Sequence, residues 1–370
     1  MSKWFRTLVV PFSLLALVAA ACGNGGGEPT GPGGTTAPAD CPADFKVGLA
    51  LDVGGLGDKS FNDAADRGVQ TAIDDGLVCA ENVEKIEANA TGSNRGENVA
   101  GLAEAGFNIV IANGFLFSTE ILGTIADFPD VNFAITDGFS SFLFDDPDTE
   151  EVEPIPANVA DLTFKEHEGS FLVGAAAVLA CGCDTIGFLG GQTDAPLIQK
   201  FEAGFVAGAQ YIDPNIQVLV EYIDPDPAVG FNDAVKGEAL STKMYQNGAE
   251  LIYHAAGASG AGLFTAAVKE NKLAIGVDSD QYLTASAEQQ PLIVTSMLKR
   301  VDVAVYNAIQ ATLDGTFVSG AQVFGLAEEG VDYSTSNTEL MTDDIITQLD
   351  EIKALILDGT VVVPDVPEGV

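Results

Sequence analysis

Short apolar segments alternate with longer amphipathic segments along the chain from Phe45 onward. The short segments are rich in β-branched and aromatic residues, whereas the longer ones repeat their apolar residues at helical spacing. This alternation is typical of parallel sheets covered by helices on both faces. It predicts an α/β protein with strands at 46–52, 108–113, 132–137, 158–163, 185–190, 216–222, 250–255, 273–278 and 292–298.

The longer segments predict the helices that connect these strands. Ser60 and Asp63 have the spacing of a capping box at the start of the first helix. Nine strands are too many for one small sheet, and a length of 370 residues suggests about two domains. The predicted helices lie near 60–76, 94–106, 118–126, 165–180, 197–211, 232–248, 260–272 and 299–315.

Ligands of open α/β sheets bind beyond the carboxyl ends of the strands. Three carboxylates and one lysine stand at these ends, which disfavours a phosphate ligand and favours a neutral ligand rich in hydrogen-bond donors. The strand-end residues are Asp52, Asn113-Gly114, Asp137, Gly190-Gly191, Ala256-Gly257 and Asp278, with Lys299 just after the last strand.

Aromatic residues stand close to the same strand ends. Phe61, Phe115 and Phe201 offer faces on which a flat ring would stack. A flat ring together with hydroxyl groups describes a nucleoside. Two alternatives remain open, because Phe61 is also in phase with the core face of its helix and a strand-end aspartate often caps a helix.

Other motifs carry less chemistry. The glycine-rich turn at 257–262 lacks the G-x-G-x-x-G spacing of a dinucleotide site. His167 and His254 belong to no zinc motif, and we expect both to be structural. The acidic run Asp145 to Glu153 lacks the spacing of a calcium loop, so we expect a solvated loop. We therefore expect no metal, no cofactor and no enzymatic activity.

The charge and the N-terminus indicate where the protein works. A net charge of −38 disfavours nucleic-acid partners. Residues 1–22 combine Lys3 and Arg6 with an apolar run too short to span a bilayer, which predicts an export signal. Small residues precede Cys22 as in a lipobox, so we expect lipidation of Cys22, with ordinary cleavage and secretion as the alternative. Residues 23–44 are then a flexible tether rich in glycine and proline.

Four further cysteines would enter an oxidising compartment. Cys41 precedes the first strand and Cys79 the second, so a disulfide between them is geometrically reasonable, with two buried thiols as the alternative. For Cys181 and Cys183 we expect free or locally paired sulfur without a catalytic role.

Ten segments together resemble the basic membrane protein family of substrate-binding lipoproteins of ABC importers. They follow the family order through most of residues 46–333, and agreement among so many motifs is highly specific. The segments are LDVGGLGDKSFNDAADRG (51–68), GFNIVIANGF (106–115), FPDVNFAITDG (128–138), FKEHEGSFLVGAAA (164–177), IGFLGGQ (186–192), KFEAGFVAGA (200–209), YHAAGASGAGLF (253–264), IGVDSDQ (275–281), SMLKRVDVAV (296–305) and FGLAEEGVDY (324–333).

The resemblance implies a type I periplasmic-binding-protein fold, with two Rossmann-like lobes joined by three hinge crossings. We expect the first lobe at 45–163 plus 278–320 and the second at 164–277 plus 321–334. Residues 335–370 lie outside the resemblance and read as an extra helix plus a short strand.

The resemblance also implies a purine nucleoside ligand that is delivered to an ABC permease and its ATPase. Phe61 and Phe201 would sandwich the base, and Asp137 would bind its polar edge. Asp278 and Lys299 would hold the ribose hydroxyls. The other residues expected around the ligand are Asp52, Asn62, Gly114 and Gly257. We expect a monomer, anchored through Cys22 to the extracytoplasmic face of the cell membrane.

A carboxylate at Asp137 accepts hydrogen bonds from the N1–H of guanosine or inosine, whereas adenosine lacks this donor. We therefore expect oxopurine nucleosides to bind at least as well as adenosine. Two other interpretations remain: a binding protein for another flat ring such as riboflavin, and a sensory lipoprotein that is not coupled to transport. A nucleoside-cleaving enzyme would need a nucleophile and base, which the sequence does not place together.

Overall fold

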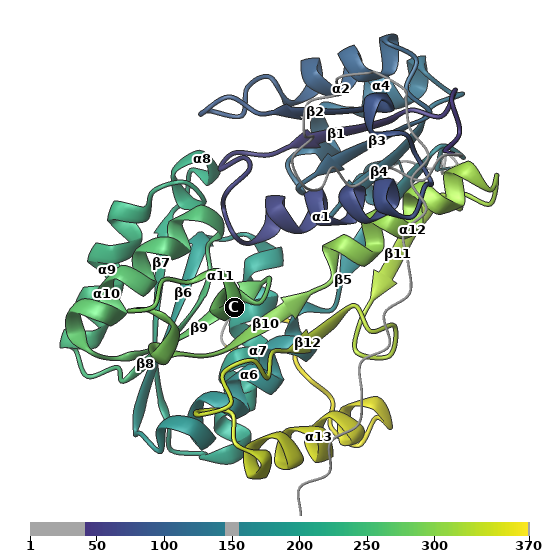
Figure 1. Cartoon of the computed structure of the whole chain (residues 1–370). Coiled ribbons are helices and arrows are strands. Elements are labelled where there is room, and N and C mark those ends of the chain that lie inside the picture. Colours follow the sequence, from purple (N-terminus) through teal and green to yellow (C-terminus); the bar gives the residue numbers. More distant parts are fainter. Residues whose placement is uncertain (1–40, 145–154, 369–370) are drawn as a thin grey trace, which may run out of the picture. The chain divides into compact units, whose positions relative to one another are not determined.

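The computed structural model describes residues 41–144 and 155–368 of the chain (Figure 1). These residues belong to one compact unit and form two six-stranded sheets. The expected signal segment at 1–22, its Cys22, nearly all of the tether and the acidic run Asp145 to Glu153 lie outside the described residues. Within the described ranges, every helix is too short or too polar to cross a bilayer.

The first sheet is wholly parallel. Its buried central strands are continuous apolar runs, as expected for a sheet covered on both faces. The strands, in spatial order, are β11 (Gly320–Phe324), β5 (Val159–Phe164), β4 (Asn132–Thr136), β3 (Ile109–Asn113), β1 (Val47–Leu51) and β2 (Val83–Glu87).

The second sheet repeats this plan with one antiparallel edge strand, β12. Its strands, in spatial order, are β12 (Val331–Tyr333), β10 (Ile293–Lys299), β9 (Leu273–Asp278), β8 (Leu251–Ala255), β6 (Thr185–Gln192) and β7 (Gln217–Asp224). The two sheets confirm the α/β fold of two Rossmann-like lobes.

Helices connect the strands, and the eight predicted helical regions all form. The α-helices are α1 (Phe61–Asp74), α2 (Arg95–Glu104), α3 (Phe117–Glu120), α4 (Leu122–Asp127), α5 (Ser140–Phe144), α6 (Glu166–Cys181), α7 (Pro196–Ile212), α8 (Pro227–Gly230), α9 (Ala234–Gln246), α10 (Ala261–Glu270), α11 (Gln281–Thr284), α12 (Val301–Leu313) and α13 (Asp343–Leu357). Short 3₁₀ turns are η1 (Ala80–Asn82), η2 (Gly257–Gly260) and η3 (Gln290–Leu292).

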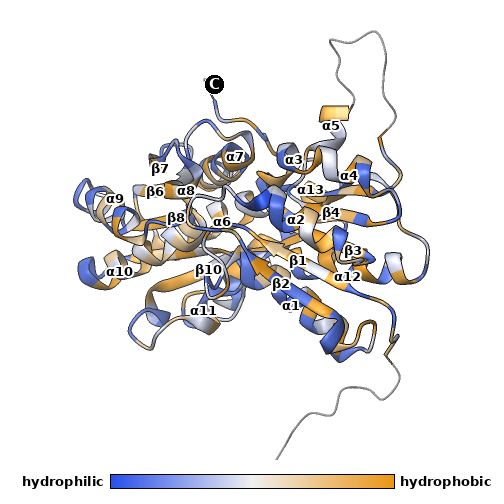
Figure 2. Ribbon diagram, turned by 90° about the horizontal axis from the view of Figure 1, so that it is seen from above, coloured by the Kyte–Doolittle hydropathy of each residue, from blue (hydrophilic) through white to orange (hydrophobic). Residues whose placement is uncertain are grey.

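Each sheet carries helices on both faces. In the first lobe, α1 and α12 cover one face and α2 to α4 the other (Figure 1). In the second, α6 and α7 cover one face and α9 and α10 the other. Hydrophobic colour runs along the central strands, whereas the edge strand β2 and the outer helices carry hydrophilic colour (Figure 2). The core under α1, α12, α6 and α7 forms one continuous cluster that includes both lobes.

The chain passes between the lobes three times: after β5, after β10 and after β11. The expected lobe boundaries are wrong in two places. Strand β10, expected in the first lobe, belongs to the second sheet, and β11, expected in the second lobe, belongs to the first. The physical reason is strand pairing. Strand β10 is hydrogen-bonded to β9 of the second sheet, and β11 is hydrogen-bonded along its full length to β5 of the first.

Three strands were not predicted: β2, β11 and β12. All three are edge strands of three to five residues with alternating or mixed exposure, so none has a recognisable apolar run. In the C-terminal extension the expected extra helix forms as α13. The expected short strand does not form within the described residues, because the chain after α13 continues without a strand partner to residue 368.

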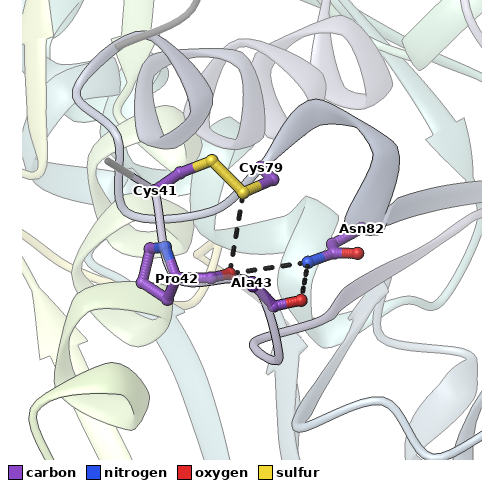
Figure 3. Close-up of a disulfide and its surroundings, with 5 residues drawn as sticks. All are labelled: Cys41, Pro42, Ala43, Cys79 and Asn82. Carbon is purple, nitrogen blue, oxygen red and sulfur yellow. Dashed lines mark hydrogen bonds between the residues drawn. A yellow bond between two sulfur atoms is a disulfide. The ribbon is translucent and has the colours of Figure 1, made fainter. Parts of the chain in front are cut away.

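Both cysteine pairs form disulfides, which decides between the alternatives that the sequence left open for each pair. Cys41 bonds to Cys79 with their Cα atoms 5.2 Å apart, and Asn82 donates a hydrogen bond to the Ala43 carbonyl beside it (Figure 3). This disulfide joins the start of the described chain to the turn before β2. Cys181 and Cys183 form a local disulfide around Gly182, which ends α6 in the left-handed conformation.

Candidate functional site

One pocket lies where strand ends of the two lobes face each other. The first lobe contributes the ends of β1, β3 and β4 and the start of α1, and the second contributes the ends of β8, β9 and β10 and the start of α7. The structure brings together every predicted ligand-binding residue along its wall: Asp52, Phe61, Asn62, Gly114, Asp137, Phe201, Gly257, Asp278 and Lys299.

Ten further residues complete the wall; Phe115 was expected to offer a stacking face and Ala256 to stand at a strand end, and the sequence did not single out the other eight. Most are small or apolar and come from loops or short turns, where no periodic pattern marks them. They are Val53, Asp58, Phe115, Leu197, Ile198, Phe231, Ala255, Ala256, Ala258 and Val277. Neither histidine lines the pocket: His254 is buried and pairs with Gln281 at 2.9 Å, and burial lowers the pKa of His254 to about 4.

The loop before α1 corrects the expected capping box. Ser60 does not cap the helix; instead its hydroxyl donates to Asp278 Oδ2 at 2.5 Å, a hydrogen bond between the two lobes. Asp58 provides the cap, because its carboxylate accepts from the backbone N–H groups of Ser60, Asn62 and Asp63. Burial raises the pKa of Asp58 to about 6, although these hydrogen bonds oppose the shift.

Asp137 and Asp278 occupy equivalent positions in the two lobes, at the ends of β4 and β9. Both have a left-handed backbone, with φ of 59° and 63°. Aspartate tolerates this region better than most residues, and such conformations concentrate at binding sites. The sharp turn directs each strand-end carboxylate into the pocket rather than along its strand.

Lys299 is the cation among these carboxylates. Its Nζ lies 2.6 and 2.7 Å from the two oxygens of Asp137 and 3.2 Å from Glu166 Oε1, and the side chain is 2% exposed. Burial raises the pKa of Asp137 to about 6, against the effect of Lys299 and with that of Glu166. Burial lowers the pKa of Lys299, but the carboxylates of Asp137, Glu166 and Asp278 outweigh it and raise that pKa above its usual range. Lys299 therefore stays charged.

Asp52, at the end of β1, is paired differently. Its Oδ1 lies 2.7 Å from Arg95 Nε and 2.6 Å from Arg95 Nη2, and Arg95 is itself buried. Gly114 packs against the other oxygen: with φ of 142°, a Cβ here would lie 2.7 Å from Asp52 Oδ2. Asn62 also faces inward, and its Oδ1 accepts from Asp52 N and Asn113 Nδ2. Asp52 and Asn62 thus form a rigid wall.

Aromatic rings enclose the pocket. The Lys299 ammonium lies 5.3 Å from the ring centroid of Phe61, 5.0 Å from that of Phe164 and 5.5 Å from that of Phe201. Phe61 and Phe201 come from different lobes and both line the pocket. The pocket therefore combines aromatic rings with a lysine and carboxylates within a few ångströms of them.

A direct contact between two aromatic rings joins the lobes. Phe115, after β3, meets Phe231, after α8, edge to face with their centroids 6.3 Å apart. The Phe231 ring lies directly on the backbone of Gly191 at the end of β6, where a Cβ would approach it to 2.4 Å. Both rings line the pocket, so the pair closes one side of it.

The sequence matches the family model for ABC transporter substrate-binding proteins of the PnrA-like type, Bmp, over residues 45–366. The chain belongs to the Bmp family. The match includes most of the C-terminal extension, which corrects the expectation that residues 335–370 lie outside the resemblance.

Curated relatives of this Bmp chain cover nearly its whole length. It is 32% identical to the CD4+ T-cell-stimulating antigen of Listeria innocua, over 88% of this chain and 89% of the relative. It is 29% identical to the ABC transporter nucleoside-binding protein BmpA of Lactococcus lactis, over 97% and 99%. It is 30% identical to basic membrane protein A of Borreliella afzelii, over 86% and 91%.

Solved structures agree with the Bmp assignment. An ABC transporter solute-binding protein from Aeropyrum pernix superposes with a TM-score of 0.70 at 25% identity, covering 86% of this chain and 94% of that one. One from Conexibacter woesei gives 0.67 at 22% identity, covering 86% and 99%, which supports the fold alone. The chain is thus a Bmp-family substrate-binding protein with the periplasmic-binding-protein fold.

Proposed function

We propose that this protein binds purine nucleosides in the pocket between its lobes and delivers them to an ABC permease. One observation carries the proposal: phenylalanines from opposite lobes, Phe61 and Phe201, line the same pocket as Asp137, Asp278 and Lys299. Two ring faces suit a flat base, and the carboxylates suit its N–H donors and the ribose hydroxyls. The name of the Lactococcus relative, a nucleoside-binding protein, points the same way.

In this proposal Phe61 and Phe201 stack on the base, and Asp137 accepts from its polar edge. Asp278 and Lys299 hold the ribose hydroxyls. Asp52, Asn62, Gly114 and Gly257 shape the remaining wall. Asp52 and Asn62 act mainly through shape, since Arg95 and backbone groups already occupy much of their hydrogen-bonding capacity.

The charge of the pocket favours nucleosides over nucleotides. Asp52, Asp137 and Asp278 line it, and Lys299, the cation that lines it, is already paired. A phosphate would therefore meet like charges without a free cation, which costs several kcal/mol at such burial. Oxopurine nucleosides are expected to bind at least as well as adenosine, because their N1–H can donate to an ionised Asp137.

The proposal includes the membrane. Lipidation at Cys22 would hold the protein on the extracytoplasmic face, with residues 23–44 as the tether to the permease, and the protein would act as a monomer. Incorporation of a labelled fatty acid, lost in Cys22→Ser, tests this part independently of the ligand.

Calorimetry on the purified protein tests the ligand. Inosine, guanosine, adenosine, inosine monophosphate, riboflavin and ribose would be titrated in parallel. We expect inosine and guanosine to bind, and the monophosphate to bind far more weakly. Binding of riboflavin or ribose alone would discard the nucleoside proposal and keep the family.

A matched pair of variants tests the stacking. Phe201→Leu removes an aromatic face from the pocket, whereas Phe205→Leu makes the same change one turn further along α7, outside the pocket. Loss of one stack is expected to weaken inosine binding by about 5- to 150-fold, corresponding to about 1–3 kcal/mol. Equal affinities of the two variants would contradict a stacking role for Phe201.

A further inference from the structure

Glu166 is a buried carboxylate beside the pocket that lines no part of it. It is the first residue of α6 and is 0% exposed. Neither of its oxygens accepts a hydrogen bond within the described structure. Its contacts are two ion pairs, one of 3.2 Å from Oε1 to Lys299 Nζ and one of 3.5 Å from Oε2 to Lys200 Nζ. A buried carboxylate so weakly paired is costly, so its presence calls for a role.

The ammonium of Lys299 stands between two carboxylates from different lobes. It is closer to Asp137, at 2.6 and 2.7 Å, than to Glu166, at 3.2 Å. Asp137 lies at the end of β4 in the first lobe, whereas Glu166 and Lys299 belong to the second. The ion pair with Asp137 therefore joins the lobes, and the one with Glu166 does not.

A ligand that donates to Asp137 competes with Lys299 for the same oxygens. If the ammonium simply lost these oxygens, it would be left poorly paired among apolar rings, at a cost of several kcal/mol. Glu166 offers an alternative, because its oxygens are within reach and accept no hydrogen bond. An exchange of partner keeps the lysine paired throughout.

We propose that Glu166 is the reserve partner of Lys299: when the N–H donors of the ligand bind Asp137, the ammonium shifts from Asp137 to Glu166. Glu166 is thus a positioning residue that acts through Lys299. The inference rests on the proposed function in one respect: the nucleoside is the ligand that displaces the ammonium from Asp137. Before the exchange, Asp137 and Lys299 connect the lobes directly. After it, the ligand connects them, because it binds Asp137 of the first lobe and residues of the second.

The position of the two residues links this exchange to the hinge. Glu166 follows the first crossing between the lobes, directly after β5, and Lys299 ends β10, just before the second crossing. Glu168, half a turn further along α6, binds the third crossing by accepting from Leu326 N at 2.8 Å. Glu166 and Lys299 therefore lie next to the first two crossings, and the helix that carries Glu166 is hydrogen-bonded to the third. A change of partner by Lys299 would take place beside these connections.

Glu166→Gln tests the exchange in the presence of ligand. The amide keeps the shape but is a weaker partner for an ammonium, so the Kd for inosine is expected to rise about 10- to 100-fold. The unfolding midpoint of the free protein should stay or rise, because a poorly paired buried charge is removed. A purely structural Glu166 would instead lower the midpoint. Wild-type affinity in Glu166→Gln would overturn the proposal.

Lys200→Met is the matched control. Lys200 is the other lysine that contacts Glu166, but it is partly exposed and lies outside the pocket. Its removal is expected to change the Kd for inosine by less than about 5-fold, as for an exposed ion pair. A loss as large as that of Glu166→Gln would show that the pair with Lys299 is not the one that matters, and would overturn the proposal.

A double-mutant cycle tests the same pairing without any ligand. Asp137→Asn and Glu166→Gln each leave Lys299 one of its two ion-pair partners, whereas the double variant removes both and leaves only the more distant Asp278. The loss of unfolding midpoint in the double variant is therefore expected to exceed the sum of the single effects. Additive effects would overturn the proposal. If the wild-type protein fails to bind inosine, the proposed function fails while this cycle still decides the role of Glu166.

Discussion

Two aspartates at strand ends line the same pocket, and each is paired with a buried cation, but the two pairs differ in kind. Asp52 faces the guanidinium of Arg95, which also donates to the Gly92 carbonyl at 3.2 Å and contacts Glu120 at 3.4 Å. Asp137 faces the ammonium of Lys299, which has Glu166 as a second carboxylate. One cation is held from several sides, and the other stands between two carboxylates.

The difference suits the two pairs to different roles: the pair of Arg95 and Asp52 to a structural role, and the pair of Lys299 and Asp137 to a role in ligand binding. A guanidinium is planar, always charged and fixed by several acceptors at once, so Arg95 holds Asp52 in one orientation. An ammonium is a compact point charge on a flexible stem, so Lys299 can change partner with small movements. The pocket therefore combines a wall whose cation is fixed with an ammonium that, in the proposed exchange, changes its carboxylate partner when a ligand binds.

The largest effect is expected for Lys299→Met. Removing this cation leaves Asp137 and Glu166 buried without a strong partner, and we expect a loss of about 5 kcal/mol in the free energy of unfolding, with inosine binding lost. Urea denaturation and calorimetry measure the two effects. The loss should be smaller at pH 5 than at pH 8, because protonation of Asp137 relieves it. Wild-type stability at pH 8 would contradict the role assigned to Lys299.

Arg95→Met sharpens the comparison. Asp52 would lose its buried partner, so we expect a loss of about 3 kcal/mol in the free energy of unfolding. Arg95 does not line the pocket, so the folded fraction should bind inosine within about 5-fold of wild type, as for a residue whose role is structural. Arg95→Lys should recover only part of the stability, because it lacks the planar fork. A larger effect on binding than on stability would place Arg95 in the site.

The pH dependence of binding is expected to come from Asp137. With a pKa raised to about 6, its protonated form gains population below that pH, and the affinity for inosine should fall about tenfold between pH 7 and pH 5. Calorimetry at both pH values measures this change. Asp137→Asn should bind weakly at both, and a wild-type affinity independent of pH would show that the base donates elsewhere.

The stability of the free protein should change with pH in the opposite direction. A carboxyl group whose pKa is raised on folding adds stability that is full below its ordinary pKa of 3.8 and is lost as the pH rises through about 6. Asp58, with a pKa raised to about 6, adds to the same trend. Unfolding midpoints between pH 4 and pH 7 measure this trend, and a midpoint that rises over this range would contradict it.

The smallest effect is expected for the aromatic contact between the lobes. Phe231→Ala removes an edge-to-face pair of about 0.5–1.5 kcal/mol, so we expect inosine to dissociate about 2- to 10-fold faster. Stopped-flow displacement measures this rate. Phe115→Ala should have a similar effect, and the double variant should lose little more than either one. Fully additive effects would show that the two rings act independently.

The sequence predicted the elements that carry strong patterns. Asp137, Asp278 and Lys299 were found because buried parallel strands are apolar runs whose last polar residue stands out. The edge strand β2 was missed because its VEKIE segment is charged and largely exposed. The lobe boundaries were wrong at β10 and β11 because the local sequence of a strand does not indicate which of two sheets it will join.

Two residues of interest were out of reach for different reasons. Glu166 looks like an ordinary acidic residue in the first turn of a helix, and only the fold shows that it is buried beside Lys299. Phe231 lies in an aperiodic segment after α8, and its position depends on Gly191 and Phe115, which are remote in the sequence. Such side chains are placed by tertiary packing rather than by local pattern.

The three crossings between the lobes also constrain how the protein folds as it is made. The first sheet lacks its edge strand until residue 324 has been synthesised, and the second lacks its own until residue 333. By then all the other strands of both sheets have been synthesised, and a sheet assembled from them alone would have an open edge that is prone to association. Neither lobe can be completed well ahead of the other, so the two reach their native state almost together, near the end of the chain.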